Sequence, residues 1–404
     1  LQGTQFTPNE YKPYSQKWED VDNQLLKPEN TQFGKYLSFT NPFRPETKQA
    51  YNSEMSFEEK IICAFQILKK KMAWNGRYQL YSKELEKVIP KGNGSNADLN
   101  FILISILKDF GLEAYPVVLS RRSSGMLPYN FPSLQKLNTF IVAIYDINKQ
   151  KYVFLDGSMD VPALNILPLE LSVNKARILS PKVKEEKKWV NVMALADNKS
   201  FMKIEARMEG NQVKGHRSTI LYGQEAVEYQ ANEKHKQDSI VSTPESNASQ
   251  KNKLTVTNLK VKKQENDWAL IEEEFDFVLQ TDQTDNHLYI NPMLFPQLKS
   301  NPFIQTERVL PIEFPYPYKF TMLTTLTLPE GYEVEETPQP QVIRTQGDGL
   351  QCKYMIQRQR NTISLNYIFY LKEPIFLTEQ YKQLQELWTK VIEKNNALIV
   401  LKKL

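Results

Sequence analysis

The stretch GNGSNADLNFILISILKDFGLEAYPVVL, residues 92–119, predicts a helix start, a helix, a stop and a strand. Ser95 and Asp98 have the spacing of a capping box, in which a hydroxyl and a carboxylate three residues later satisfy free N–H groups at a helix start. Residues 99–110 are apolar on every face of the helix, a pattern typical of a buried central helix. Gly111 is a suitable residue to end the helix.

The segments on either side of this stretch indicate an α+β core. Ser56 begins a second capping box and precedes an amphipathic helix that extends to Met72. Strands are predicted at Ala114–Ser120, Thr139–Tyr145 and Lys151–Leu155, with a turn between the last two. We therefore expect the buried helix to pack against an antiparallel sheet.

From Trp189 onward the pattern changes to short segments that alternate like strands, which predicts a β-sandwich-like domain. Thr378 begins a final amphipathic helix whose Tyr381, Leu384 and Trp388 lie on one side. The polar segment Glu233–Lys253 has few apolar residues, and we expect it to protrude or to be poorly ordered.

Composition restricts the function. The chain has 404 residues and a net charge of +4, with Lys and Glu interspersed, so it has no basic stripe of the kind that binds nucleic acid. No apolar run is long enough for a transmembrane segment. We predict no metal site, because no cluster of ligands has zinc spacing, and no cofactor, because a glycine-rich phosphate loop is missing.

The chain begins at Leu1, without an initiator Met or a signal-peptide pattern. Because LQGTQF alternates like the end of a strand, we expect the polypeptide to begin inside a larger protein. Residues 1–30 are accordingly predicted to be the remnant of a preceding β domain with a linker. Residues 31–188 are predicted to form the α+β core, and 189–404 the β-sandwich-like domain.

Several motifs resemble those of the transglutaminase-like superfamily, whose core is papain-like. They are GNGSNADLN followed by ILISILKDFGLEAYPVVLSRR, then KLNTFIVAIY, then YVFLDGSMD. The resemblance extends to WEDVDNQLL and NPFIQTERVLPIEF, and is closest to a bacterial branch with β-rich domains on both sides of the core. It implies the fold predicted above and a thiol-based active site at the start of the buried helix.

The resemblance also implies where a catalytic triad would lie. The nucleophilic cysteine corresponds to Asn96, the histidine to Thr139 and the orienting aspartate to Asp156. A carboxamide cannot act as a thiolate, and threonine cannot act as a base near neutral pH. We therefore predict a degenerate triad with no catalytic residues.

Other residues have both a structural and a functional interpretation. Ser95 is interpreted as a helix cap, with a shifted nucleophile as the alternative, and Asn96 as a cap or turn residue. Asp156 is either a vestigial orienting group or an acceptor of backbone N–H bonds at a strand end. Cys63 in an amphipathic helix is typically a small buried hydrophobe. The histidines lie far downstream, as His216 does in a β segment.

Two hypotheses follow. The first is a catalytically degenerate protein, a pseudoenzyme of the transglutaminase-like superfamily, that acts as a binding or scaffolding module with a peptide, protein or glycan as its ligand. By resemblance it would be exported to the periplasm or the cell surface. The alternative is an active cysteine- or serine-type peptidase, amidase or transglutaminase with an unrecognised nucleophile.

Overall fold

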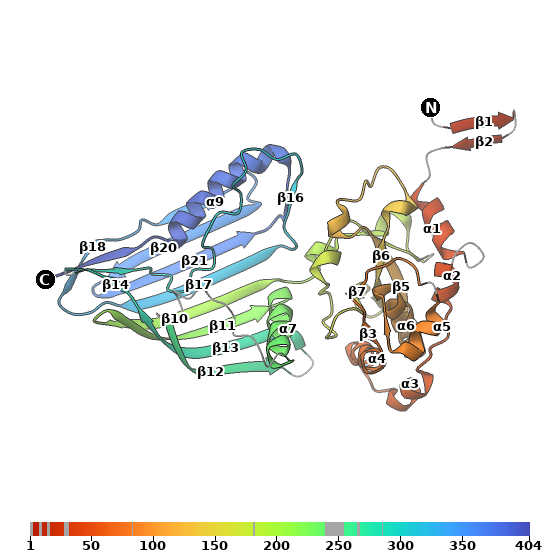
Figure 1. Ribbon diagram of the computed structural model, residues 1–404, viewed down its shortest axis with the longest axis horizontal. Helices are drawn as coiled ribbons and strands as arrows, with labels where there is room; N and C mark the ends of the chain where they lie inside the picture. The colour runs from red at the N-terminus through yellow and green to blue at the C-terminus, as the bar shows by residue number, and fades with distance from the viewer. Residues whose placement is uncertain are drawn as a thin grey trace. The chain divides into compact units, whose positions relative to one another are not determined.

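The chain forms two units, unit 1 (Leu1–Ala196) and unit 2 (Asp197–Leu404), in the computed structural model (Figure 1). The structure describes residues 3–7, 10–13, 17–27, 32–82, 84–180, 182–238, 254–264, 267–284 and 286–404. The predicted domain boundary lay between residues 188 and 189. The observed units divide later because Trp189 still belongs to a strand that pairs within unit 1, with Arg177 as its partner.

Unit 1 is a helical layer on an antiparallel sheet with strand order β7-β6-β5-β8-β9. Its helices are α1 (Trp18–Leu26), α2 (Gln32–Leu37), α3 (Arg44–Ala50), α4 (Phe57–Lys71), α5 (Leu85–Val88) and α6 (Asn96–Asp109). The sheet strands are β5 (Glu113–Leu119), β6 (Thr139–Asp146), β7 (Lys151–Leu155), β8 (Ala176–Ile178) and β9 (Trp189–Val190), and the short pairs are β1 (Gly3–Thr7) with β2 (Glu10–Pro13) and β3 (Ala73–Trp74) with β4 (Asn93–Gly94). The predicted α+β class is confirmed.

Helix α6 is the buried central helix that the sequence predicts. Ser95 caps it: the Asp98 N–H donates to Ser95 Oγ over 3.3 Å, and the Ser95 N–H donates to Asp98 Oδ2 over 2.8 Å. Every residue from 96 to 107 is buried. The helix packs against α4, β5 and β6, so its apolar surface joins the helical layer to the sheet.

Helix α1 belongs to the core of unit 1, although residues 1–30 were predicted to lie outside it. Trp18, Val21 and Leu25 are buried in the same apolar cluster as α6. Asp22 on α1 forms a 2.7 Å ion pair with Arg177 on β8, and Arg177 is fully buried. A buried ion pair of this kind fixes one geometry, because separating the partners would leave an uncompensated charge.

Unit 2 is built on an eight-stranded sheet with strand order β12-β13-β11-β10-β17-β21-β20-β19 (Figure 1). Its strands are β10 (Lys199–Glu209), β11 (Gln212–Tyr222), β12 (Leu254–Gln264), β13 (Asp267–Gln280), β17 (Tyr318–Thr327), β19 (Gln341–Arg344), β20 (Leu350–Gln359) and β21 (Thr362–Leu371). β10 and β17 run parallel from Lys199↔Lys319 to Arg207↔Thr327, and the other paired strands that the structure describes in this sheet are antiparallel. The sheet therefore consists of two antiparallel sets of four strands joined by one parallel pair.

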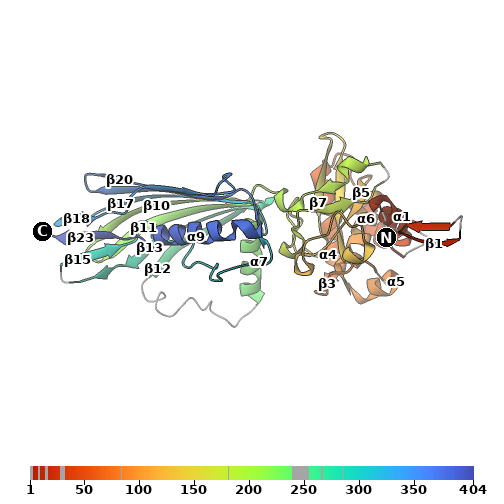
Figure 2. The same ribbon diagram turned by 90° about the horizontal axis from the view of Figure 1, so that it is seen from above.

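One face of this sheet is covered by α9 (Tyr381–Asn395), which runs along it in Figure 2, and by a smaller sheet. The smaller sheet has the order β14-β15-β23-β18. Its strands are β14 (Asp282–Gln283), β15 (His287–Ile290), β18 (Tyr332–Glu336) and β23 (Ile399–Lys403), and β16 (Ile312–Glu313) pairs separately with β22 (Ile375–Phe376). Tyr381, Leu384 and Trp388 are buried in the shared core, as predicted, and the arrangement is sandwich-like.

Of the segment Glu233–Lys253, the structure describes residues 233–238, which are helical. Residues 224–238 form a helix, α7 (Gln224–Asp238), which buries Ala226 and Val227 and packs against β13. The remainder of the segment lies outside the described residues. Helix α7 is difficult to predict from the sequence because the helix is mostly polar, so its pattern of apolar residues at helical spacing is weak.

Replacing Trp388 with alanine should destabilise unit 2 by about 3–5 kcal/mol, the usual cost of deleting a large aromatic side chain from a core. Its ring contacts Phe303, Phe314 and Phe369 at centroid distances of 5.2, 5.7 and 5.5 Å. Urea unfolding would measure the change. The control is Lys390→Ala, on the exposed side of the same helix, where a change within about 0.5 kcal/mol is expected. Equal effects of the two substitutions would contradict the docking of α9.

Candidate functional site

The three positions that correspond to the triad come together at the start of α6. The Asn96 carboxamide Nδ2 donates to Thr139 Oγ1 over 2.6 Å and to the Phe140 carbonyl over 3.1 Å. Its Oδ1 accepts the Gln79 N–H over 2.8 Å. Asn96 was interpreted from sequence as a cap or turn residue. Instead it is the first residue of the helix, and its side chain fastens the helix to β6.

Asn100, one turn further along α6, was missed in the sequence analysis. Its Nδ2 donates to Asp156 Oδ2 and to the Phe140 carbonyl, each over 2.8 Å, and its Oδ1 accepts the Gly157 N–H over 2.7 Å. The signal was the i, i+4 spacing of two asparagines, which places both on one face of an otherwise apolar helix. Asn96, Asn100, Thr139, Asp156 and Ser158 together are called the buried polar network below.

The Phe140 carbonyl is the acceptor that the two asparagines share. The register of β6 with β7 begins at Val142↔Leu155, beyond Phe140. A buried carbonyl without a strand partner on that side must find donors elsewhere. Both of its lone pairs are used here, one by Asn96 and one by Asn100.

Asp156 is fully buried at the end of β7. Its Oδ1 accepts bonds from the Ser158 N–H, over 2.9 Å, and from the Ser158 hydroxyl. Burial raises the pKa of the Asp156 carboxyl, while the hydrogen bonds from Ser158 and Asn100 oppose that rise. Gly157 is needed beside it, because a Cβ there would come within 3.1 Å of Asn100 Oδ1.

The buried polar network offers no surface to a substrate. Asn96, Thr139 and Asp156 are each 0% exposed. The segment 77–79 covers the helix start, because the Asn96 N–H donates to the Arg77 carbonyl over 3.0 Å in addition to the bond from Gln79. A substrate could reach Asn96 only if this segment separated from α6.

The alternative nucleophiles are poorly placed for catalysis. Ser95 Oγ donates to Asp98 Oδ2 over 2.8 Å, as a capping residue does. Burial raises the pKa of the Cys63 thiol, and raises that of Cys352 to about 11. Thiols with raised pKa values are protonated near neutral pH and are weak nucleophiles.

The three histidines of the chain, His216, His235 and His287, all lie in unit 2. His216 pairs with Asp276 over 2.9 Å, and His287 pairs with Glu335 over 3.0 Å. A thiol or hydroxyl nucleophile needs an imidazole or another base within hydrogen-bond reach. Both contacts are to carboxylates at the surface of unit 2.

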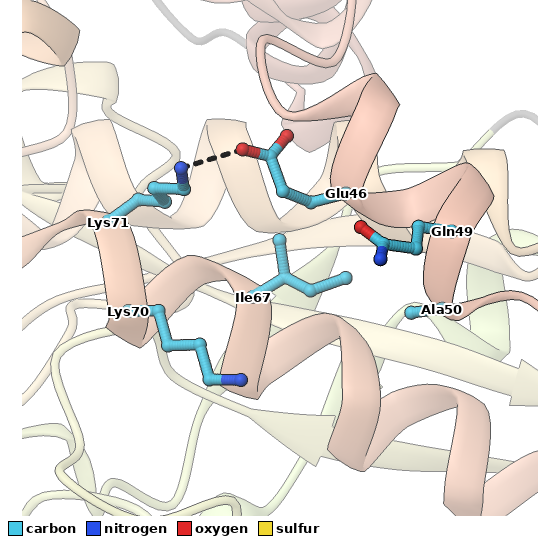
Figure 3. A pocket seen from close by; sticks show the side chains of 6 residues that line it. All are labelled: Glu46, Gln49, Ala50, Ile67, Lys70 and Lys71. Carbon is cyan, nitrogen blue, oxygen red and sulfur yellow. Dashed lines mark ion pairs between the residues drawn. The ribbon is translucent and has the colours of Figure 1, made fainter.

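A hollow of about 290 Å³ lies between α3 and α4 (Figure 3). It is lined by Glu46, Gln49, Ala50, Ile67, Lys70 and Lys71. Lys71 forms a 2.6 Å ion pair with Glu46 across it, so that cation is already neutralised. The hollow contains none of the residues of the buried polar network.

In the described part of the chain, no group of three or more His, Cys, Asp or Glu side chains is placed to hold a metal ion. The helices of that part are all too short or too polar to cross a membrane.

Comparison with known proteins gives two likenesses. Residues 286–401 match a family described as a domain of unknown function with a solved structure, DUF3858. The fold is similar to that of a crystal structure described as a "putative protease" from Parabacteroides distasonis, with a TM-score of 0.50 and 12% sequence identity. The likeness covers 95% of this chain and 58% of that chain, so this chain spans little more than half the length of that protein. No curated protein matches the sequence.

The residues that match DUF3858 form a contiguous part of unit 2. It begins beside β15 and ends within β23, and these two strands pair through Leu288↔Leu401. It includes α9 and the four strands on one side of the parallel junction. These likenesses establish similarity of fold only.

Replacing Asn100 with alanine should lower the free energy of unfolding of unit 1 by about 3 kcal/mol, because Asp156 Oδ2 and the Gly157 N–H would lose a buried partner. The matched control is Ser105→Ala in the same helix. Ser105 is also buried, but bonds only to the Ile102 carbonyl of its own turn, so a loss below about 1 kcal/mol is expected. Urea unfolding would measure both. A smaller loss for Asn100→Ala than for Ser105→Ala would show that the network is not needed for stability.

The thiols should react as protonated groups. At pH 8, iodoacetamide should alkylate Cys63 more slowly than free cysteine, whose pKa is about 8.5, and the rate should keep rising above that pH because burial raises the pKa of Cys63. Cys352, which is fully buried, should react only after unfolding. Mass spectrometry of timed samples would follow both sites. Rapid alkylation of Cys63 at pH 6.5 would reveal an activated thiolate and support the enzyme hypothesis.

Proposed function

We propose that this chain is a catalytically inactive member of the transglutaminase-like superfamily that acts as an exported binding or scaffolding module. The observation that carries the proposal is the 2.6 Å bond between Asn96 Nδ2 and Thr139 Oγ1. These residues occupy the positions where the superfamily would have its thiolate and its imidazole. An amide that donates to a hydroxyl provides neither a nucleophile nor a base.

The surroundings of Asn96 support an inactive site as well. A catalytic thiolate is favoured at a helix N-terminus, because the helix dipole stabilises negative charge there. In this chain Asp98 takes that place, since its carboxylate accepts both the N–H and the hydroxyl of Ser95.

The binding or scaffolding role rests on what the fold retains. Asp156 keeps its position, and the layers around it are those of the superfamily core to which the motifs are similar. The proposed ligand is a peptide, protein or glycan. Export to the periplasm or cell surface is proposed from the resemblance to the bacterial branch with flanking β-rich domains.

The full chain should give no turnover of peptide substrates and no transfer of an amine to a glutaminyl peptide. Mass spectrometry of the substrates after prolonged incubation would detect either reaction. Ser95→Ala and Cys63→Ala are the informative variants, because they remove the alternative nucleophiles. Turnover by the wild type that is abolished in either variant would overturn the proposal.

The closure of the site can be tested separately with Asn96→Cys in a Cys63→Ala background. A thiol at this position should be alkylated at least about a hundred times more slowly in the folded protein than in urea, since the opening of segment 77–79 must precede the reaction. Equal rates in both conditions would show that the site is open.

A further inference from the structure

Arg121, just beyond β5, is a cation with no carboxylate partner among the described residues, and it lies near the buried polar network. Its Nε is buried and has no hydrogen-bond partner, and among the described residues no carboxylate lies within ion-pair distance of its guanidinium. The residue as a whole is partly exposed. Because buried polar atoms are usually hydrogen-bonded, an unpartnered one shows that this guanidinium is incompletely satisfied within the described part of the chain.

Arg121 is linked to the network through Tyr78. Its guanidinium lies over the Tyr78 ring, 5.9 Å from the centroid. Ser158 and Asp156 of the network are both close enough to Tyr78 to influence the pKa of its hydroxyl, and Ser158 is bonded to Asp156. Burial raises the pKa of Tyr78 to about 12, so its phenol is neutral and able to donate at neutral pH.

Trp74 adds an apolar surface to the same place. Its ring lies 4.9 Å from that of Tyr78, and both side chains are partly exposed. The Trp74 indole N–H donates to the Arg77 carbonyl, which holds the ring in position. Glu170 is the other nearby acid that acts on Tyr78, and its Oε1 is engaged by the N–H and hydroxyl of Ser123.

We propose that Arg121, Tyr78 and Trp74 form a subsite for the carboxylate of an oligopeptide, located above the closed triad position. The guanidinium would bind the carboxylate through paired N–H donors, the geometry in which arginine binds carboxylates most strongly. The aromatic pair would contact the adjoining peptide residue. A neutral glycan would leave the guanidinium unpaired, so a peptide acid suits the site better. The inference rests on the proposed binding function and specifies its ligand.

The test uses the full chain labelled with ¹⁵N and three probe peptides. They are N-acetyl-trialanine with a free C-terminal carboxylate, the same peptide as its C-terminal amide, and N-acetyl-Ala-Glu-Ala amide. The readout is the shift of the Trp74 indole N–H signal, assigned with Trp74→Phe. The free acid should bind, and the trialanine amide should bind at least about tenfold more weakly, because it lacks a charge-assisted bond. The glutamyl peptide shows whether a side-chain carboxylate serves as well as a terminal one.

Substitutions of Arg121 and Arg122 test which guanidinium binds the carboxylate. Arg121→Gln should weaken binding of the free acid at least about tenfold, and Arg121→Lys should restore only part of it, because an ammonium lacks the planar fork. Arg122→Gln is the matched control and should bind as the wild type does, since Arg122 donates to the Ser172 carbonyl. If Arg121→Gln fails to fold, the comparison of acid with amide on the wild type still decides the question.

Three results would overturn the subsite: equal binding of trialanine acid and amide, an equal loss in Arg122→Gln, or acetate binding as tightly as the peptide, which would indicate an adventitious anion only. Cleavage of a bound peptide, read by mass spectrometry in the same samples, would overturn the inactive-site proposal and leave the subsite standing. Absence of both binding and cleavage would remove the subsite alone.

Discussion

The Asn100 carboxamide is the interaction on which unit 1 depends. It joins α6, β6 and the end of β7, because one side chain bonds to the Phe140 carbonyl, to Asp156 and to the Gly157 N–H. A carboxylate that is fully buried is costly unless donors surround it. Asp156 has such donors from Asn100 and Ser158, and the alignment of helix with sheet follows from this requirement. The apolar cluster around α6 supplies most of the burial, but any orientation would bury Leu and Ile; the amide network selects one.

The sequence predicts the frame of unit 1 well, because its signals are local. Ser95 and Asp98 form the capping box in the structure, and the all-round apolar pattern of α6 corresponds to a helix buried on every side. The role of Asn100 depends on residues 40 or more positions away, and no local pattern specifies which strand carbonyl it will meet. Helix α7 was missed for a different reason, since its docking relies on Ala226 and Val227 within a mostly polar segment. Asp22 belongs to the core through an ion pair with Arg177, 155 positions later, which composition cannot reveal.

The buried polar network has side chains that serve stability, and this is the basis of the proposed absence of catalysis. In an enzyme the groups at these positions must change charge during the reaction and must reach a substrate. Such groups therefore need hydrogen-bonding capacity that the protein leaves unused, and some exposure to solvent. Here Asn96 and Asn100 cannot titrate, and their amide protons are all committed to acceptors. The arrangement that would orient an imidazole in an enzyme here satisfies the hydrogen-bond donors and acceptors of the asparagine side chains. Stability and catalysis make opposite demands on this location, and the side chains present satisfy the first.

Unit 2 depends on a different structural feature. Its large sheet is continuous across a parallel junction between two antiparallel sets of strands. Hairpins join β10 to β11, β12 to β13, β19 to β20 and β20 to β21, but the β10–β17 pair is parallel and joins segments more than 100 residues apart. Of the two sets, the DUF3858 match covers only the one that contains β17, together with α9 and most of the smaller sheet. One apolar cluster nevertheless includes Met202 and Ile204 of β10 with Met322 of β17 and Leu384 of α9. Because a core shared across the junction couples the two sets, the matched segment in this chain is part of a larger packed unit that also includes β10.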